Sequence, residues 1–235
     1  MIPTCTRKPN TMRILIINPN SDPGMTAAIQ ESAIAYAGGD FEVVTLATPE
    51  APRFLESYED EIRCGPGLMK SLREHEDAFD AFVIACHSDS HLNAAREITH
   101  KPVIGIGEAS MKLASFLGHN FSVITTHQHS VPGKLLQVRA YHLQDFLVSI
   151  RAPDEGEEGW SNGELFMELS RRAVKEDGAE VLVLGCAGLS GMDRKIREAL
   201  NVPVLDGVPC ALILASGFAR YGVGTSKVLG YNPDY

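Results

Sequence analysis

Short runs of consecutive apolar residues recur along the whole sequence. Seven of these runs are rich in Val, Ile and Leu, and polar residues do not alternate within them. This is the pattern of strands that are buried on both faces, as in a parallel sheet covered by helices. Helical stretches lie between several of the runs, and this alternation predicts an α/β protein. The predicted strands are 13–17, 41–46, 81–85, 102–106, 121–125, 181–184 and 202–205, and the predicted helices include 25–36, 164–176 and 193–200.

An internal repeat is the most informative feature of the sequence. Residues 76–86 (EDAFDAFVIAC) align without gaps on residues 176–186 (EDGAEVLVLGC), so Cys86 and Cys186 end equivalent strands. A Pro-Val pair follows 16 residues after the first cysteine and 17 residues after the second. A unit of about 100 residues therefore occurs twice.

The repeat predicts two similar Rossmann-like subdomains with mainly parallel sheets, related by pseudo-two-fold symmetry. The carboxyl ends of parallel strands open onto the crevice in which α/β proteins bind ligands. We therefore expect Cys86 and Cys186 to face each other across a cleft between the subdomains. A single buried cysteine more commonly fills core space. A packing role does not explain, however, why a cysteine recurs at the equivalent point of both halves.

Two facing thiols suit a reaction that inverts a carbon centre. Backbone N–H groups and the helix dipole lower the pKa of a cysteine at a helix start, and we expect this of both Cys86 and Cys186. One thiolate then removes a proton next to a carbonyl, while the other thiol delivers a proton to the opposite face. The helix N-termini stabilise the charge that moves onto the carbonyl oxygen. No cofactor is needed if the C–H bond is already activated.

Composition narrows the class of partner. The chain has 235 residues, with 30 acidic and 21 basic side chains and a formal charge of −9. This balance excludes a broad nucleic-acid-binding surface and argues against anionic membranes. No apolar run reaches the roughly 18 residues of a membrane span, and the polar N-terminus lacks the apolar region of a secretory signal. With five cysteines and no Cys-x-x-Cys motif, we predict a reduced, cytoplasmic protein that acts on a small molecule, with a homo-oligomer as an open possibility.

Three groups of residues resemble the hydantoin racemase family, which includes allantoin racemases and belongs to the aspartate/glutamate racemase superfamily. They are ILIINPNS at 14–21 with Met25-Thr26, VIAC at 83–86 with PVIGIGEA at 102–109, and VLGCAG at 183–188. The resemblance covers nearly the whole chain from about Met12 onward. It implies two α/β subdomains, a C-terminal segment that returns to the first of them, and epimerisation by Cys86 and Cys186 without PLP or another cofactor.

The expected division of the chain follows from the repeat and the resemblance. The stretch 152–163, in which Pro, Gly and acidic residues surround Trp160, is predicted to be a surface loop, with a lid over the site as the alternative. The divisions are an arm over 1–11 that is expected to be disordered, a first subdomain over 12–107, a second subdomain over 108–206 and the returning segment over 207–235.

The resemblance also implies which residues contact the substrate. They are Asn18, Thr125 or Thr126, and the residues after each cysteine, which are His87 and Ser88 in the first half and Ala187 and Gly188 in the second. His87 is equally expected to line the pocket or to support it from behind. Members of the family often carry an aromatic residue after the first cysteine and a Pro-Gly pair soon after, whereas this chain reads CHSDSHL at 86–92. This departure bears on the side chain that the pocket accepts.

The residues after the second cysteine favour a neutral substrate over an amino acid. Amino-acid racemases of the superfamily resemble Cys-Asn-Thr and Cys-Thr-His at these places, whereas Ala187-Gly188 leaves small residues and backbone amides. A ring with urea-like N–H and C=O groups fits this lining, and the adjacent carbonyl acidifies the C5–H bond of a hydantoin. We therefore predict a racemase that inverts C5 of a 5-substituted hydantoin or of allantoin.

Two other functions stay open. A maleate-type cis–trans isomerase of the superfamily would use one cysteine to add to a double bond. It would also need groups that bind two carboxylates, and no cluster of arginines stands near either cysteine in the sequence. A non-catalytic ligand-binding protein on the same scaffold would keep the cleft but would not need both thiols. Arylmalonate decarboxylases share the fold but typically keep only one of the two cysteines, so the presence of both argues against that activity.

Histidines near the first cysteine invite a metal interpretation that we do not favour. His87, Asp89 and His91 are closely spaced, but only i and i+4 share a helix face and no third donor stands at ligand spacing. No metal is therefore expected. His127 and His129 are expected to be solvated loop residues, with contact to the substrate as the alternative.

Other motifs are predicted to be structural. GIGEAS at 105–110 lacks the third glycine of a dinucleotide-binding fingerprint. Cys64 and Cys210 do not recur in the repeat, and Cys5 lies in the expected arm.

Overall fold

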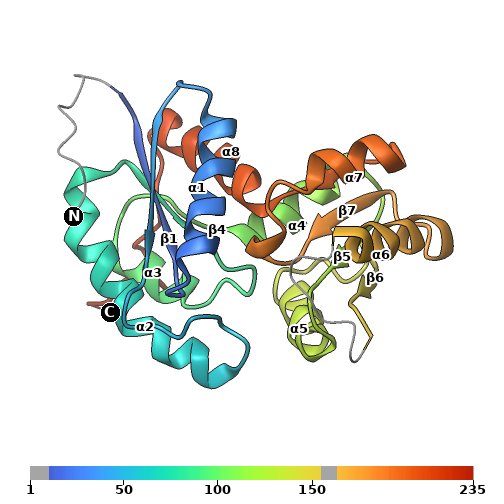
Figure 1. Ribbon diagram of the computed structural model, residues 1–235. Coiled ribbons are helices and arrows are strands. Elements are labelled where there is room, and N and C mark those ends of the chain that lie inside the picture. Colours follow the sequence, from blue (N-terminus) through green and yellow to red (C-terminus); the bar gives the residue numbers. More distant parts are fainter. Residues whose placement is uncertain (1–10, 155–162, 235) are drawn as a thin grey trace.

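The computed structural model describes residues 11–154 and 163–234 (Figure 1). All but Thr11 of the expected arm and most of the expected loop over 152–163 lie outside the described residues, as do Cys5 and Trp160. The strands are β1 (Arg13–Asn18), β2 (Glu42–Ala47), β3 (Ala81–Ile84), β4 (Val103–Gly105), β5 (Phe121–Ile124), β6 (Leu147–Arg151), β7 (Val181–Leu184) and β8 (Val204–Leu205). The helices are α1 (Pro23–Ala37), α2 (Tyr58–His75), α3 (Leu92–Ile98), α4 (Ile106–Leu117), α5 (Val131–Ala140), α6 (Gly163–Glu176), α7 (Asp193–Leu200) and α8 (Gly207–Tyr221), with short 3-10 helices η1 (Glu76–Ala78), η2 (Gln128–Ser130) and η3 (Ala187–Leu189).

The two halves of the chain repeat one topology. The strand order is β2-β1-β3-β4 in the first sheet and β6-β5-β7-β8 in the second, and every neighbouring pair is parallel. Each strand of the first sheet therefore has its counterpart four strands later. The aligned segments of the repeat form β3 and β7, which end two residues before Cys86 and Cys186. The predicted α/β class and the two similar subdomains are confirmed.

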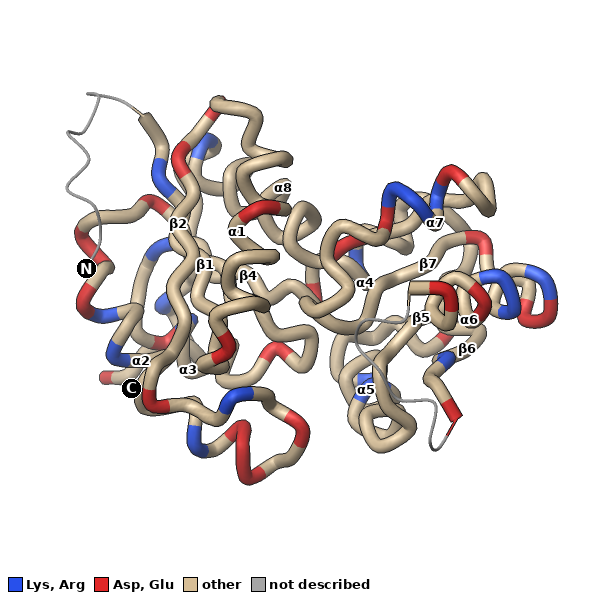
Figure 2. The backbone as a smooth tube through the Cα atoms, in the orientation of Figure 1, with Lys and Arg blue, Asp and Glu red and all other residues tan. Residues whose placement is uncertain are grey.

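Burial on both faces of each sheet explains the continuous apolar runs. In β1, Ile14 and Ile16 pack toward α1 and α8, whereas Leu15 and Ile17 pack toward α2 and α3. The second sheet is covered in the same way, by α4 and α5 on one face and by α6 and α7 on the other (Figure 1). Of the inner strands, β3, β5 and β7 carry no Lys, Arg, Asp or Glu, as Figure 2 shows for β5 and β7, and β1 carries only Arg13 at its first position.

Strand β6 is the element of the sheets that the sequence pattern did not predict. It forms one edge of the second sheet, and its residues are half-buried or exposed. An edge strand that is partly wet does not need a continuous apolar run, so it lacks the signal by which the other strands were found.

The two halves meet where α4 and α8 begin. Ile106 and Gly207 each stand four residues after the proline of their Pro-Val pair, so they are equivalent in the repeat. A Cβ atom on Gly207 would lie 2.9 Å from Ile106 Cβ and 2.9 Å from Ile106 O. Equivalent residues touch each other only near a two-fold axis. The pseudo-two-fold axis therefore passes between these two helix starts.

The C-terminal segment contacts the first half of the chain. Helix α8 packs on α1, β3 and β4. Beyond it, the backbone N–H of Thr225 donates to His100 O at 2.9 Å, and Lys227 Nζ donates to the last carbonyls of α3, Arg96 O at 2.7 Å and Glu97 O at 2.8 Å. The division at 107/108 and 206/207 stays a prediction. None of the described helices has both the length and the apolar composition that crossing a membrane requires.

Candidate active site

The loop after β3 positions Cys86. Its backbone carbonyl accepts a hydrogen bond from the N–H of Asp89 at 3.0 Å, which closes a tight turn, and Asp89 takes a left-handed conformation with φ 54°. Cys86 Sγ lies 3.1 Å from the hydroxyl of Ser88, and the thiol is half-buried. Helix α3 begins only at Leu92. The cysteine therefore does not sit at the helix start that the sequence led us to expect.

Cys186 lies at the equivalent place after β7 and is half-buried, as Cys86 is. Its sulfur accepts a hydrogen bond from the N–H of Gly188 at 3.3 Å and a second one from the side chain of Thr126. Burial nevertheless raises the pKa of the Cys186 thiol to about 12, and the nearby Cys86 charge adds to this effect. The predicted lowering of the Cys186 pKa is wrong, because η3 is only three residues long and desolvation outweighs its N–H groups.

A buried lysine of the second half lies within electrostatic reach of both thiols. Lys134 on α5 is 6% exposed, and its ammonium group donates to His87 Nδ1 at 2.8 Å, His87 O at 2.8 Å and Gln137 Oε1 at 3.3 Å. Burial lowers the pKa of Lys134, whereas thiolate charge on Cys86 or Cys186 raises it. The two cysteines and this ammonium group therefore share one electrostatic environment.

His87 supports this lysine from the first half. It is 2% exposed, and its Nε2 lies 3.2 Å from Ser110 Oγ, whose hydrogen is directed to the carbonyls of Ile106 and Gly107. The ring therefore carries its hydrogen on Nε2 and accepts the Lys134 hydrogen bond at Nδ1. Burial and the Lys134 charge lower the pKa of His87 well below its usual range, which keeps the ring neutral.

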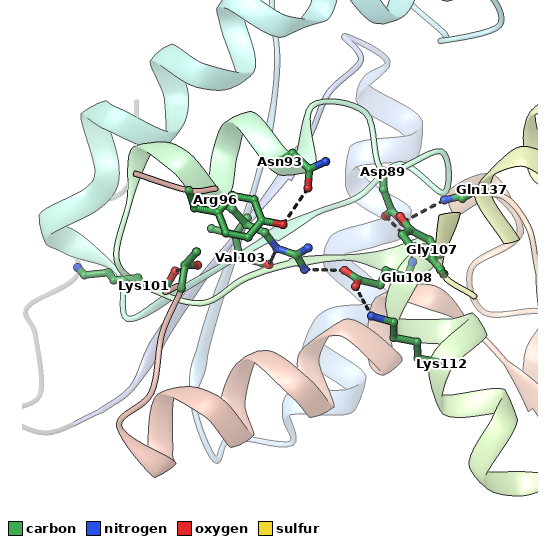
Figure 3. Close-up of polar contacts among 12 residues, drawn as sticks. Asp89, Asn93, Arg96, Lys101, Val103, Gly107, Glu108, Lys112 and Gln137 are labelled. Atoms are coloured by element: carbon green, nitrogen blue, oxygen red, sulfur yellow. Dashed lines mark hydrogen bonds and ion pairs between the residues drawn. The ribbon is translucent and has the colours of Figure 1, made fainter. Parts of the chain in front are cut away.

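Asp89 joins the loop of Cys86 to both α4 and α5 (Figure 3). Its carboxylate accepts hydrogen bonds from the N–H groups of Gly107 (3.0 Å) and Glu108 (2.6 Å), at the start of α4. From the second half, Gln137 Nε2 donates to it at 3.0 Å and the Tyr141 hydroxyl at 2.6 Å. Burial raises the pKa of Asp89 to about 6, although these hydrogen bonds oppose the shift.

Glu108, whose N–H donates to Asp89, extends this group of polar contacts. Its carboxylate pairs with Arg96 of α3 and with Lys112 one turn further along α4 (Figure 3). The start of α4 is thus fixed to α3, the helix that follows the Cys86 loop.

Asp206 fixes the loop of Cys186 in a corresponding way. This residue is the N-cap of α8, and its carboxylate accepts from the N–H of Val208 at 2.9 Å. The Ser190 hydroxyl (3.1 Å) and the N–H of Gly191 (3.1 Å) also donate to it. Each cysteine loop is therefore tied to a later helix by its own buried aspartate. Asp89 ties the loop of Cys86 to α4, and Asp206 ties the loop of Cys186 to α8.

Known proteins resemble this chain in sequence and in fold. Residues 14–215 match the sequence profile of a family described as Asp/Glu/Hydantoin racemase. The chain belongs to this family. The expected family is confirmed, and with it an isomerase of the racemase type.

Individual members of the family match over almost their whole length. The hydantoin racemase of Pseudomonas sp. (strain NS671) is 37% identical over 226 residues, which cover 94% of this chain and 91% of that protein. The hydantoin racemase of Rhizobium meliloti is 38% identical, with 94% of both proteins covered. The structure of allantoin racemase from Klebsiella pneumoniae superposes with a TM-score of 0.89 at 31% identity, over 94% of this chain and 93% of that one.

In this member of the racemase family, the two candidate threonines have different partners. The side chain of Thr126 bonds Cys186, whereas Thr125 Oγ1 lies 2.8 Å from Ser130 Oγ and is almost fully buried. Of the two alternatives from the sequence, Thr126 is therefore the one beside a cysteine.

The other expected contact residues divide into exposed and buried ones. Ser88 is exposed next to Cys86, and the N–H of Gly188 bonds Cys186. Ala187 is buried in the core cluster of the first half. Asn18 is fully buried, and its amide donates to Asn20 Oδ1 at 2.8 Å and Thr26 Oγ1 at 2.9 Å, which shapes the turn after β1.

The residues considered for a metal site have separate partners. His87 bonds Lys134, Asp89 bonds the start of α4, and His91 Nε2 bonds the backbone carbonyl of Glu61. In the described part of the chain, no three His, Cys, Asp or Glu side chains come together as a metal ion would require.

Two cavities lie away from both cysteines. One, of about 400 Å³, is lined by residues of α5 and β6 such as Leu135 and Ile150, and the other, of about 510 Å³, lies beside His100 and Gly222. The cleft expected between the cysteines stays a prediction.

Proposed function

We propose that this chain is a cofactor-independent racemase that inverts C5 of a 5-substituted hydantoin or of allantoin, with Cys86 and Cys186 as its two acid–base groups. The observation that supports it most is the symmetry of the site. Two thiols at equivalent strand ends share the electrostatic environment of one buried ammonium group, Lys134. The named activities of the hydantoin and allantoin racemases that this chain resembles support the choice of substrate.

In this mechanism, Cys186 begins as the proton donor, because burial raises its pKa and keeps it protonated. A thiolate at Cys86 removes the C5 proton from one face of the ring, and the electron pair of the C–H bond moves onto the adjacent carbonyl oxygen. The Cys186 thiol then delivers its proton to the other face of C5, which inverts the configuration. The reverse reaction exchanges the two roles.

Lys134 keeps the charge of this cycle balanced. One thiolate is present before the reaction and one after it, on the opposite side of the ring, and Lys134 lowers the free energy of a thiolate at either position. The substrate contacts proposed for Asn18, Thr126, Ser88 and Gly188 fit a neutral ring with N–H and C=O groups. The same proposal includes contacts of the substrate with His87, Thr125 and Ala187, which would be made by their backbone atoms or as part of the pocket wall.

The Cys86→Ser and Cys186→Ser variants test this proposal. Each should lower inversion of a chiral hydantoin at least about 10²–10⁴-fold, because each removes one positioned acid–base group. In D₂O, Cys186→Ser should still exchange the C5 hydrogen of one enantiomer, and Cys86→Ser that of the other. Polarimetry measures inversion, and NMR measures exchange.

The matched control is Cys210→Ala, which removes a buried thiol of the core outside the site. It should racemise at the parent rate. A single-cysteine variant that still inverts at the parent rate would contradict the two-base assignment. Binding of the hydantoin without inversion or exchange would favour the non-catalytic alternative, and isomerisation of maleate would favour the cis–trans isomerase.

The setting of the protein is part of the proposal. We infer a small-molecule substrate and a cytoplasmic location, with assembly into a homo-oligomer as a further expectation. Sedimentation of the purified chain measures its oligomeric state directly.

A further inference from the structure

A line of side chains connects Cys86 to a carboxylate on another element. Cys86 Sγ lies 3.1 Å from Ser88 Oγ, Ser88 Oγ lies 2.7 Å from Ser90 Oγ, and Ser90 Oγ lies 3.2 Å from Glu61 Oε1. The two serines belong to the loop after β3, whereas Glu61 lies in the first turn of α2. All three distances are within hydrogen-bonding range.

The chemistry of the end member gives this line a direction. Ser90 Oγ lies 3.2 Å from Glu61 Oε1 and 4.0 Å from Cys86 Sγ, so its single hydrogen is donated to the nearer carboxylate, which only accepts hydrogen bonds. Ser90 then accepts from Ser88, and Ser88 in turn accepts from the Cys86 thiol. The S–H bond of Cys86 therefore points toward Glu61 through two hydroxyl groups.

The acidic end of the line is held firmly. A capping box between Ser57 and Asp60 fixes the start of α2. The backbone carbonyl of Glu61 bonds His91 Nε2 of the cysteine loop and also accepts from Cys64 Sγ at 3.1 Å. Ser90 itself is 5% exposed, whereas Glu61 is only half-buried. The line therefore leads from the thiol to a group that solvent can reach.

Cys186 has a different set of partners. Its sulfur bonds the N–H of Gly188 and the side chain of Thr126, and neither leads to a carboxylate among the described hydrogen bonds. The two thiols are thus equivalent in position but unequal in their access to an external proton acceptor.

We propose that Ser88, Ser90 and Glu61 form a proton relay that resets Cys86 between turnovers, which rests on the racemase function proposed above. The thiol passes its proton to Ser88 while Ser88 passes its own to Ser90 and Ser90 passes its own to Glu61. One S–H bond breaks and one O–H bond forms on the carboxyl group, which then exchanges its proton with water. The reverse sequence returns a proton to the thiolate.

The relay matters because a two-base racemase ends each turnover with its protons exchanged. Before it can act again on the same enantiomer, one thiol must lose a proton and the other must gain one. This reset limits kcat, since free enzyme accumulates in the wrong form at high substrate concentration. It does not limit kcat/KM, because at low concentration the free enzyme equilibrates between encounters.

Two variants test the relay. Ser90→Ala removes the middle of the line without changing any charge, and Glu61→Gln keeps the hydrogen-bond acceptor but cannot take up the proton. Each should lower kcat about tenfold, less than the loss of a direct acid–base group because water replaces part of the path. The value of kcat/KM should stay within about twofold of the parent in both directions, and the effect of D₂O on kcat should increase.

Glu59→Gln is the matched control, because Glu59 is an exposed acid of the same helix turn. It should leave both kinetic constants at the parent values. An unchanged kcat in Ser90→Ala and Glu61→Gln, an equal fall of kcat and kcat/KM, or the same fall in Glu59→Gln would each overturn the relay. A parent protein that inverts no hydantoin would overturn the proposed function itself, and the relay with it.

Discussion

Burial raises the pKa of Cys186 and lowers the pKa of Lys134, the two ionisable partners at the centre of the site. It favours the neutral thiol at Cys186 and the neutral amine at Lys134, yet each charged form stabilises the other. Cys186 and Lys134 therefore titrate as a coupled pair, and their protonation states cannot be assigned to either residue alone. A buried ammonium bonded to three acceptors is a preformed countercharge for whichever thiol is ionised.

The raised pKa of Cys186 predicts slow alkylation of this residue. A free cysteine has a pKa of about 8.5, so at neutral pH the half-buried Cys186 thiol, with a pKa of about 12, holds far less thiolate. A thiolate with a higher pKa is more nucleophilic, but this compensates for only part of the loss of thiolate in the alkylation rate. Iodoacetamide should therefore modify Cys186 about 10²-fold more slowly in the folded chain than in the unfolded chain. The rate should rise with pH throughout the alkaline range, as measured by peptide mass spectrometry.

The reference for this measurement is the same cysteine in guanidinium chloride. Fast modification of Cys186 in the folded protein at neutral pH would show that the thiol is ionised there, and would contradict its assignment as the first proton donor.

The sequence predicted the cysteine pair and its neighbours His87, Ser88 and Gly188, but not Lys134 or Glu61. The pair was visible because the repeat marks equivalent positions. Lys134 was hidden, since on α5 it is buried while its neighbours Leu135 and Leu136 are 39% and 58% exposed, the reverse of the usual pattern. Glu61 meets Ser90 only because α2 packs beside the cysteine loop, and no local spacing carries that information.

At the level of elements, the two halves solve one capping problem differently. Asp206 caps α8 with its own side chain, but the equivalent N-cap of α4 is Gly105, which has none. Asp89 of the Cys86 loop supplies the missing carboxylate to Gly107 and Glu108. The first cysteine loop and the start of α4 therefore form one unit.

Gly105→Ala tests this exchange of caps. A Cβ at Gly105 would lie 2.1 Å from Asp89 Oδ1, so the buried carboxylate would have to leave its N–H donors. We expect a loss of about 1–3 kcal/mol in the free energy of unfolding, measured in urea. Racemisation should fall as well, because Asp89 holds the loop of Cys86.

Gly217→Ala is the comparison, since a Cβ there would meet nothing within 4 Å and Gly217 lies inside α8. It should stabilise the protein by about 0.5–1 kcal/mol, because alanine favours the helix. Equal stability of the two variants would contradict the account of Gly105.

Strand prediction from the sequence depended on apolar runs rather than on complete burial, because β2 was found although most of its residues are half-buried. The seven strands found from apolar runs lie in the two sheets, whereas the edge strand β6 was missed. The repeat compensated for this weakness at the level of topology, because it required the second half to reproduce the first.

At the scale of the whole molecule, the contact between α4 and α8 joins the halves. Ile106 and Ala109 of α4 share one core cluster with Val208 and Ala211 of α8, and this cluster extends to β1 and β3 of the first sheet. Further along α4, Met111 and Ala114 belong to a core cluster of the second sheet. Helix α4 is therefore part of both cores.

Gly207→Ala is expected to strain this joint. The added Cβ would approach both Cβ and the backbone oxygen of Ile106 at 2.9 Å, and backbone cannot give way as a flexible side chain does. We expect a destabilisation of about 1–3 kcal/mol and a lower Tm by calorimetry. Gly217→Ala on the same helix serves again as the control, and a Gly207→Ala variant as stable as that control would contradict the close contact.

The chain passes between its two halves twice, once into α4 and once into α8, and both passages lie side by side where Ile106 meets Gly207. The loop of Cys86 adds a further connection, because Lys134 and Gln137 of α5 donate hydrogen bonds to His87 O and to the Asp89 carboxylate across the two halves. A rotation of one half about the contact between Ile106 and Gly207 would have to break these buried hydrogen bonds. The spacing of the halves is therefore fixed both at the two helix starts and at the first cysteine loop.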